Sequence, residues 1–278
     1  MKKVKIQDAI ISAFHSHSKK KFLLVCLALF IFIAAINIFN AAKIQGSNAM
    51  DVLFFSFCGT SIVNTNLALN LQWLLIQLIL IAMIGDFTFN QIFYKGTFIL
   101  IRFKSKYMLW ISQIIYISIV VFIFLILGFS VVYLLSLIVF SNVSNEWFHS
   151  AAQIYNIPTN VSALHIIAQM FILLYLSSLC SVIMQSLISV ITKNILFPLV
   201  FIIILHAFTL NSGKIDINSV KWIIGNQSML VRHTIIDHSI KNFSITWSLI
   251  YTTLVIVIIV LIGFYVIHKT DLFIEQKN

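Results

Sequence analysis

The stretch GDFTFNQIFYKGTFILIRFKSKY occupies residues 85–107. It lies between two long apolar runs, and its second half carries four cations: Lys95, Arg102, Lys104 and Lys106. A cation-rich connection between two membrane spans is expected on the cytoplasmic side. The sequence therefore predicts a membrane-spanning helix on each side of this stretch and places the stretch itself inside the cell.

The first half of the stretch is rich in aromatic residues, namely Phe87, Phe89, Phe93 and Tyr94. Aromatic side chains with no predicted packing partner are typical of a surface that docks into another protein. They are also expected in a loop that only sets topology and rests its rings at the lipid interface. Both interpretations stay open, and the first of them predicts a cytoplasmic partner.

The composition of the whole chain supports a membrane assignment. Of the 278 residues, 60% are hydrophobic and only 9% are charged, and the mean hydropathy is +1.03, whereas soluble domains carry about 25% charged residues. The net charge of +10 gathers at the ends of apolar runs, which indicates membrane topology and not nucleic-acid binding. We expect an all-α, multi-pass protein forming one transmembrane domain over residues 1–278. The abundance of Lys, Ile, Phe and Asn favours the plasma membrane of a bacterium with an AT-rich genome.

Apolar runs predict six transmembrane helices with both termini cytoplasmic, at residues 22–39, 67–84, 108–140, 163–191, 195–210 and 245–267. Residues 1–21 alternate lysine with apolar residues at helical spacing, which predicts an amphipathic helix in the membrane surface. The run at 108–140 would make a helix of roughly 50 Å, longer than a hydrocarbon core of about 30 Å. It forms either one protruding helix or two short helices that turn near Gly128. The shortage of polar side chains to satisfy a turn in lipid favours one helix.

The predicted outer connection at residues 211–244 has an unusual centre. The sequence KWIIGNQSMLVRHTIIDHSIK at 221–241 mixes apolar residues with Arg232, two histidines and an aspartate. Irregular backbone at membrane depth is stable only where it is buried in protein or lines a cavity. The segment therefore reads as a re-entrant, gate-like element or as an ordinary interfacial loop.

No pattern typical of catalysis or of a cofactor occurs in the chain. It lacks the phosphate-binding GxxxxGK[ST], HExxH and GxSxG. The acidic residues fall outside the predicted spans, and the three cysteines are scattered. We expect a chain that is not an enzyme and that holds no metal or cofactor. His206, inside a predicted span, is read either as an interhelical hydrogen-bond donor or as part of a substrate path.

Three stretches resemble the transmembrane subunit of ABC-2-type ABC exporters, a group that includes permeases for bacteriocin immunity and peptide export. They are FHSHSKKKF at residues 14–22, the inner loop with YKG at 94–96 and ILIRFKSK at 99–106, and GNQSMLVR at 225–232. Six spans with both ends inside also match this family. Because the shared motifs are loose and hydrophobic, they indicate the family but do not identify a substrate.

The resemblance implies that residues 85–107 form a coupling element that inserts into a separate ATPase subunit, where ATP and Mg²⁺ would bind. The residues implied in this contact are Phe89, Phe93, Tyr94, Lys95, Gly96 and Arg102. It also implies an outer gate at 211–244, with Trp222, Met229 and Arg232 as its residues. Two permease chains, identical or different, would work with two ATPases in the lipid bilayer.

The function implied is export of an amphipathic or antimicrobial peptide, or immunity to one. The main alternative is a non-catalytic membrane scaffold or sensor that binds a cytoplasmic partner through the same loop. An intramembrane enzyme is the third reading. It predicts that a single polar residue such as His206 abolishes activity without altering assembly.

Overall fold

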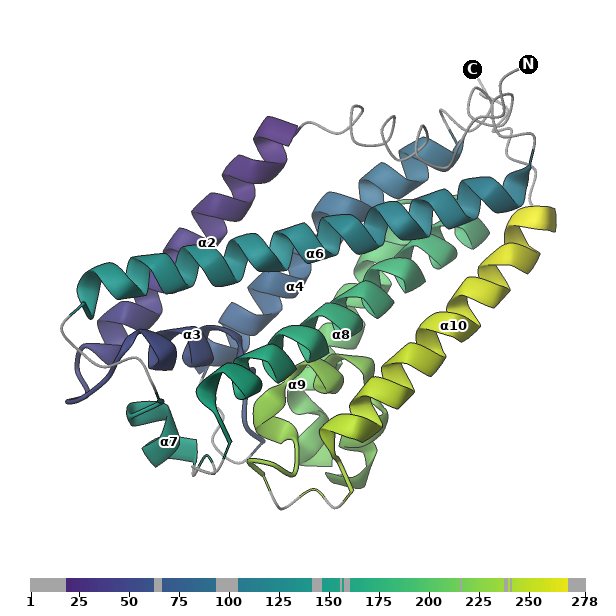
Figure 1. The fold of residues 1–278 in the computed structure, drawn as a ribbon. Helices are drawn as coiled ribbons and strands as arrows, with labels where there is room; N and C mark the ends of the chain where they lie inside the picture. The colour runs from purple at the N-terminus through teal and green to yellow at the C-terminus, as the bar shows by residue number, and fades with distance from the viewer. Residues whose placement is uncertain are drawn as a thin grey trace.

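The computed structural model describes residues 19–62, 67–93, 105–141, 147–155, 157, 161–215, 217–237, 240 and 242–269, and over these residues the protein is all-helical (Figure 1). Its α-helices are α2 (Lys19–Ala41), α3 (Ala49–Phe57), α4 (Leu67–Phe93), α6 (Lys106–Val139), α7 (Ser150–Tyr155), α8 (Ala163–Thr192), α9 (Leu196–Ile215) and α10 (Ile245–Lys269). Three short 3₁₀ helices, η1 (Ile217–Trp222), η2 (Ile224–Ser228) and η3 (Leu230–Arg232), lie between α9 and α10.

Five of the described helices, α2, α4, α6, α8 and α10, are long and apolar enough to cross a membrane. The apolar part of α9, Leu196–Ser212, is shorter. The predicted class is therefore confirmed at the level of a helical, multi-pass membrane protein. Each predicted apolar run coincides with one of these six helices.

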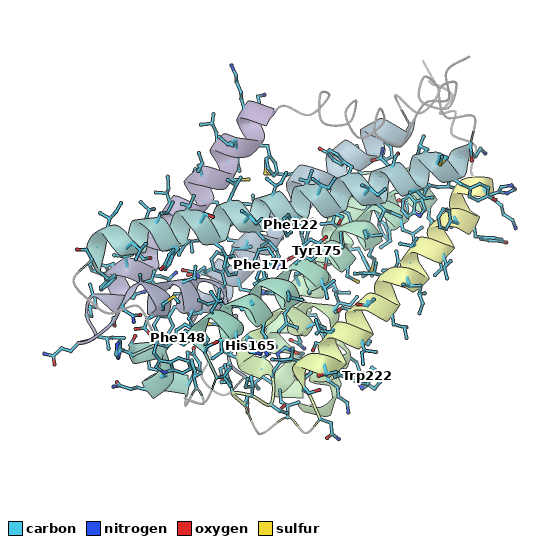
Figure 2. The ribbon with its side chains drawn as sticks, in the orientation of Figure 1. Phe122, Phe148, His165, Phe171, Tyr175 and Trp222 are labelled. Carbon is cyan, nitrogen blue, oxygen red and sulfur yellow. The ribbon has the colours of Figure 1, made fainter. Side chains whose placement is uncertain are left out.

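The run at 108–140 is one helix, as predicted. α6 continues without a break from Lys106 to Val139, and Gly128 lies inside it because another helix crosses there. A Cβ atom at Gly128 would lie 2.5 Å from the ring of Phe30 on α2. Six residues before Gly128, the ring of Phe122 on α6 meets the rings of Phe171 and Tyr175 on α8 (Figure 2). Close packing, and not a turn, explains the glycine.

The loop predicted at 85–107 is shorter in the structure than predicted. α4 extends nine residues beyond the predicted end of its span, to Phe93, and α6 already begins at Lys106. The connection between them is therefore residues 94–105. At the start of the chain, α2 begins at Lys19, so the last three residues of the interfacial helix predicted at 1–21 belong to α2. Residues 1–18 of that prediction lie outside the described residues.

The predicted polar connection at 41–66 contains a helix that the sequence analysis missed. α3 is buried along most of its length and packs against α2 and α6. It starts with a capping box, in which the Asn48 side chain accepts from the backbone N–H of Asp51 while the Asp51 carboxyl accepts from that of Asn48. Gly59, in the left-handed conformation at φ +84°, follows the helix and turns the chain.

The two ends of the helix bundle differ in charge. One end, which we call the basic end, contains the start of α2 and α6, the turn from α8 to α9 and the end of α10. It carries Lys20, Lys21, Lys106, Lys193 and Lys269. The opposite end holds α3, α7 and the 3₁₀ helices (Figure 1).

At the basic end, α6 and α10 are joined closely. A Cβ atom at Gly263 of α10 would lie 2.3 Å from the Trp110 ring of α6, so only glycine lets the two helices approach this far. The Trp110 indole donates to the Val260 carbonyl at 3.2 Å, and the Lys106 ammonium donates to the His268 carbonyl at 3.3 Å. The residues that follow the connection 94–105 are therefore fixed to the end of α10.

Candidate functional site

The candidate site is a buried, irregular segment at the end opposite the basic end. Residues 225–233 are all buried, although they form only short 3₁₀ turns. We call residues 224–233 the plug. This placement favours the re-entrant reading over an ordinary interfacial loop, because an interfacial loop would expose its backbone.

Side chains from three long helices hold the plug. The Trp73 indole of α4 donates to the Ser228 hydroxyl at 3.0 Å, and the Ser177 hydroxyl of α8 donates to the Ile224 carbonyl at 2.8 Å. On α10, the Ser248 hydroxyl lies 2.7 Å from Nε2 of a plug histidine. Each bond satisfies a polar group that would otherwise be buried without a partner. The plug thus bridges helices that are distant in sequence.

Two glycines allow the plug to sit this close to its neighbours. A Cβ atom at Gly225 would lie 2.4 Å from the Thr209 hydroxyl of α9, and one at Gly59 would lie 2.6 Å from the Met229 side chain. Larger residues at either position would push the plug away from α9 or from the turn after α3. A backbone hydrogen bond also joins the plug to the end of α3, because the Val231 N–H donates to the Cys58 carbonyl at 3.2 Å.

Arg232 is the centre of the plug's polar contacts, with a side chain only 1% exposed. Its Nε donates to the Thr60 carbonyl at 2.8 Å and its Nη2 to the Thr60 hydroxyl at 3.2 Å. Its Nη1 donates to the Thr209 carbonyl at 3.0 Å, to the Asn226 amide oxygen and to the Ser212 hydroxyl. We call these acceptors the Arg232 cage. The guanidinium fork matches a cage contributed by three separate segments.

Burial sets the electrostatics of this site, because the groups of the Arg232 cage are uncharged oxygen atoms. Burial lowers the pKa of Arg232 to about 10, and the charge of Asp237 acts in the opposite direction. Arg232 therefore stays cationic at neutral pH, in a cage of neutral oxygen atoms. A buried cation is costly unless its donors are all satisfied, so the cage holds the plug in one position.

His233, next in the chain, is neutral. Burial lowers its pKa to about 4, and hydrogen bonds with the backbone of Met229 and Leu230 only partly oppose this. Its Nδ1 donates to the Met229 carbonyl at 2.9 Å, which leaves Nε2 as the acceptor for the Ser248 hydroxyl. The ring also stacks on Phe243 at 4.3 Å. His233 thus works as a neutral hydrogen-bonding bridge between the plug and α10.

The three residues expected at an outer gate lie at the plug or beside it. Met229 and Arg232 are in its buried interior, whereas Trp222 is 54% exposed at the surface (Figure 2). The Trp222 ring packs edge-on against Trp247 and Tyr251 of α10, and the Tyr251 hydroxyl donates to the Trp222 carbonyl at 2.6 Å. Such an aromatic group is typical of a membrane–water interface.

The residues expected to contact an ATPase are less completely described. Phe89 is 4% exposed and packs in the hydrophobic core, so the expectation of a ring with nothing to pack on does not hold for it. Phe93 is the last residue of α4, and its side chain lies outside the described part. The remaining four, Tyr94, Lys95, Gly96 and Arg102, lie outside the described residues altogether.

His206, for which the sequence left two interpretations, lies close to a residue that contacts the plug. Its ring stacks on Trp73 at 5.5 Å, and its Nδ1 donates to the Ile202 carbonyl one helical turn earlier at 2.9 Å. This bond stays within α9, so it does not bear out an interhelical donor, and Nε2 of the ring is buried without a hydrogen-bond partner among the described residues. Trp73 in turn bonds to the plug, so His206 supports a plug contact from behind.

Several residues of this site carry no sequence signal. Thr60, Thr209, Ser212 and Asn226 form the Arg232 cage but belong to no motif, and only the fold brings them together. Asp51 could have been found, because Asn-x-x-Asp before an apolar run is a capping pattern. Its carboxyl also accepts from the backbone N–H groups of residues 149–151, which joins α3 to the start of α7.

Neither a protein-family model nor a curated protein sequence matches this chain. Among the described residues, no group of three or more His, Cys, Asp or Glu side chains is arranged to hold a metal ion. The chemistry that the described site offers is hydrogen bonding. The plug is held by groups near the start of α4 and α10, in the middle of α8 and near the end of α9.

Proposed function

We propose that this chain is the permease subunit of an ABC exporter of the ABC-2 type, driven by a separate ATPase subunit. The observation that carries the proposal is the plug, a buried irregular segment at one end of a helix bundle whose other end is basic. Backbone of this kind is stable at membrane depth where it is buried in protein or lines a cavity, and we assign the plug the role of a gate. The resemblance of residues 94–96, 99–106 and 225–232 to this family supports the same assignment.

In this proposal the basic end is cytoplasmic, as the positive-inside rule requires. α9 is the sixth span, and its apolar part of 17 residues, Leu196–Ser212, gives roughly 25 Å of helix. Both termini are then cytoplasmic, and the plug faces outward as the outer gate. The membrane is the plasma membrane of a bacterium.

The working unit contains two permease chains and two ATPase subunits, which bind ATP and Mg²⁺. The connection 94–105, together with Phe93, docks into the ATPase. Because α6 follows this connection and is fixed to α10 at Trp110 and Gly263, a movement of the connection reaches α10. His233 of the plug bonds to the other end of α10. The cargo is an amphipathic or antimicrobial peptide, which the exporter removes from the cell or to which it confers immunity.

We expect the tagged protein, purified in mild detergent from its own cells, to bring down an ATPase with a phosphate-binding loop in stoichiometric amount. Changing Phe93 and Tyr94 together to alanine removes the aromatic anchors that dominate such contacts. The double variant should lose at least about 90% of the ATPase, since loss of two anchors of about 1 kcal/mol or more each exceeds a tenfold change in affinity. Quantitative mass spectrometry of the eluate measures this loss.

The matched control changes Leu196 and Phe197, two exposed apolar residues at the basic end of α9, to alanine. This variant should retain the ATPase at the wild-type level. An eluate without any ATPase, or equal retention by both double variants, contradicts the proposal. A stoichiometric partner without nucleotide-binding motifs would favour the scaffold alternative.

A further inference from the structure

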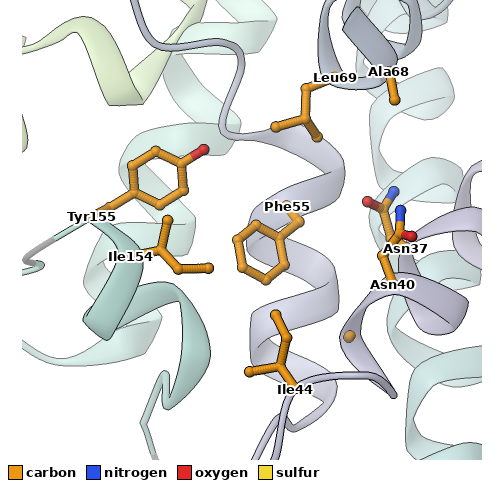
Figure 3. A pocket seen from close by; sticks show the side chains of 9 residues that line it. Asn37, Asn40, Ile44, Phe55, Ala68, Leu69, Ile154 and Tyr155 are labelled. Atoms are coloured by element: carbon orange, nitrogen blue, oxygen red, sulfur yellow. The ribbon is translucent and has the colours of Figure 1, made fainter. Parts of the chain in front are cut away.

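A separate cavity lies beside α3, away from the plug. Its volume is about 430 Å³, within the range of small-molecule sites. The last turn of α2, the start of α4, and parts of α3 and α7 form its walls (Figure 3). Its lining residues are Asn37, Asn40, Ala41, Ile44, Phe55, Ala68, Leu69, Ile154 and Tyr155.

The lining combines apolar walls with a few neutral polar groups. Phe55, Leu69 and Ile154 supply bulky apolar contact, and Figure 3 shows the Tyr155 ring beside Ile154, across Phe55 from the two asparagines. The Asn37 amide donates to the Ile33 carbonyl at 3.0 Å and to the Gln72 side chain at 2.8 Å. These bonds fix its orientation and leave its carbonyl oxygen as the acceptor for a ligand. Such a lining suits a ligand that has an apolar chain and, next to the chain, uncharged polar groups.

The surface around the cavity is apolar and exposed. Phe39 is 66% exposed, Leu67 72% and Ile154 51%, as expected for side chains that face lipid. Lys43 lies between the lining residues Ala41 and Ile44, and its ammonium sits 4.2 Å above the Phe39 ring. A cation therefore lies next in the chain to the lining residue Ile44, over an exposed aromatic ring.

We propose that this cavity holds one acyl chain of an anionic phospholipid, with the lipid phosphate at Lys43. The apolar walls take the chain, the asparagine amides and the Tyr155 hydroxyl meet the ester and glycerol oxygens, and the Lys43 cation selects the negative head group. The proposal does not rest on the transport function, because it uses only the cavity and Lys43. An apolar peptide segment would fill the same walls, but it has no phosphate for Lys43.

The test uses purified protein, stripped by detergent exchange and then incubated with dioleoyl phosphatidylglycerol, with native mass spectrometry as the readout. Ala68→Phe places a ring in the cavity from the first turn of α4. We expect this variant to retain at least about tenfold less lipid, since losing a buried chain of a few methylenes exceeds 1.4 kcal/mol. Ala82→Phe, an equal change at an exposed site on the same helix, should retain lipid as the wild type does.

Head-group selection is tested by Lys43→Gln, with Lys221→Gln as control at the same end of the bundle. Lys43→Gln should lower phosphatidylglycerol retention about fivefold and leave the weaker retention of phosphatidylcholine unchanged, whereas the control changes neither. Glycerol phosphate, which lacks acyl chains, should not be retained. Equal retention by Ala68→Phe and Ala82→Phe overturns the proposal. So does a loss with Lys43→Gln that is the same for both lipids, or a native adduct whose mass is that of a peptide.

Discussion

Replacing Arg232 with methionine is expected to lower the free energy of unfolding by about 3–5 kcal/mol, because it leaves several buried acceptors without a donor. Methionine has a similar length but no donor, so the carbonyls of Thr60 and Thr209 and the Asn226 amide oxygen lose their buried partner. Each acceptor left without a donor costs about 1–3 kcal/mol. Denaturant unfolding of the purified protein in detergent, followed by tryptophan fluorescence, measures the loss.

The control for this change is Lys43→Met, which removes an exposed cation and should change stability by less than about 0.5 kcal/mol. Arg232→Lys keeps the charge but replaces the planar fork by a single ammonium. The free energy of unfolding of Arg232→Lys should therefore lie between that of the wild type and that of Arg232→Met. If Arg232→Met unfolds at the same denaturant concentration as Lys43→Met, the Arg232 cage does not hold the plug.

Replacing Asp51 with alanine is the second change expected to have a large effect, a loss of about 3–5 kcal/mol. The Asp51 side chain is fully buried and accepts the backbone N–H of Asn48 at 3.1 Å, Ser150 at 3.2 Å and Ala151 at 2.9 Å. Alanine accepts none of them, so the capping box is lost and the start of α7 separates from α3. A Tm lower by about 10 °C follows from a loss of this size in a chain of this length.

Asp51→Asn keeps one acceptor oxygen but turns an amide N–H₂ toward backbone donors. Its Tm should therefore lie between that of the wild type and that of Asp51→Ala. The control is Ser56→Ala on the same helix, whose hydroxyl bonds only to the Val52 carbonyl one turn back. That change should shift Tm by less than about 3 °C. A fall in Tm of similar size for Asp51→Ala and Ser56→Ala would show that the carboxyl does not join α3 to α7.

The sequence was sufficient to locate the long helices because each is a continuous apolar run, and this signal depends on no distant residue. Their ends were harder to place. Residues 85–93 contain Gly85, Asp86, Thr88 and Asn90, which look like a loop, yet α4 continues through them. α3 was missed because nine residues are too few for a span and the surrounding connection is polar.

The plug was partly predictable, and its contacts were not. The mixture of apolar residues with Arg232 and His233 indicated either a re-entrant element or an interfacial loop, and only the burial of residues 225–233 favours the first. The Arg232 cage depends on pairs such as Thr60 with Arg232, separated by 172 residues, and no local pattern encodes them. For Phe89 the sequence showed an aromatic ring, but only the fold shows that the ring is buried.

Nucleotide-dependent labelling of the plug, in the complex with the co-purified ATPase, shows whether the plug opens during ATP turnover. Val231, which is 1% exposed, is changed to cysteine, and a water-soluble maleimide is added with ATP and Mg²⁺ or with ADP. The parent chain is the control, because its three cysteines are buried. If the plug is a gate driven by the ATPase, Val231→Cys is labelled during ATP turnover and stays unlabelled in ADP. Labelling that is the same with ATP, with ADP and without nucleotide would contradict this account.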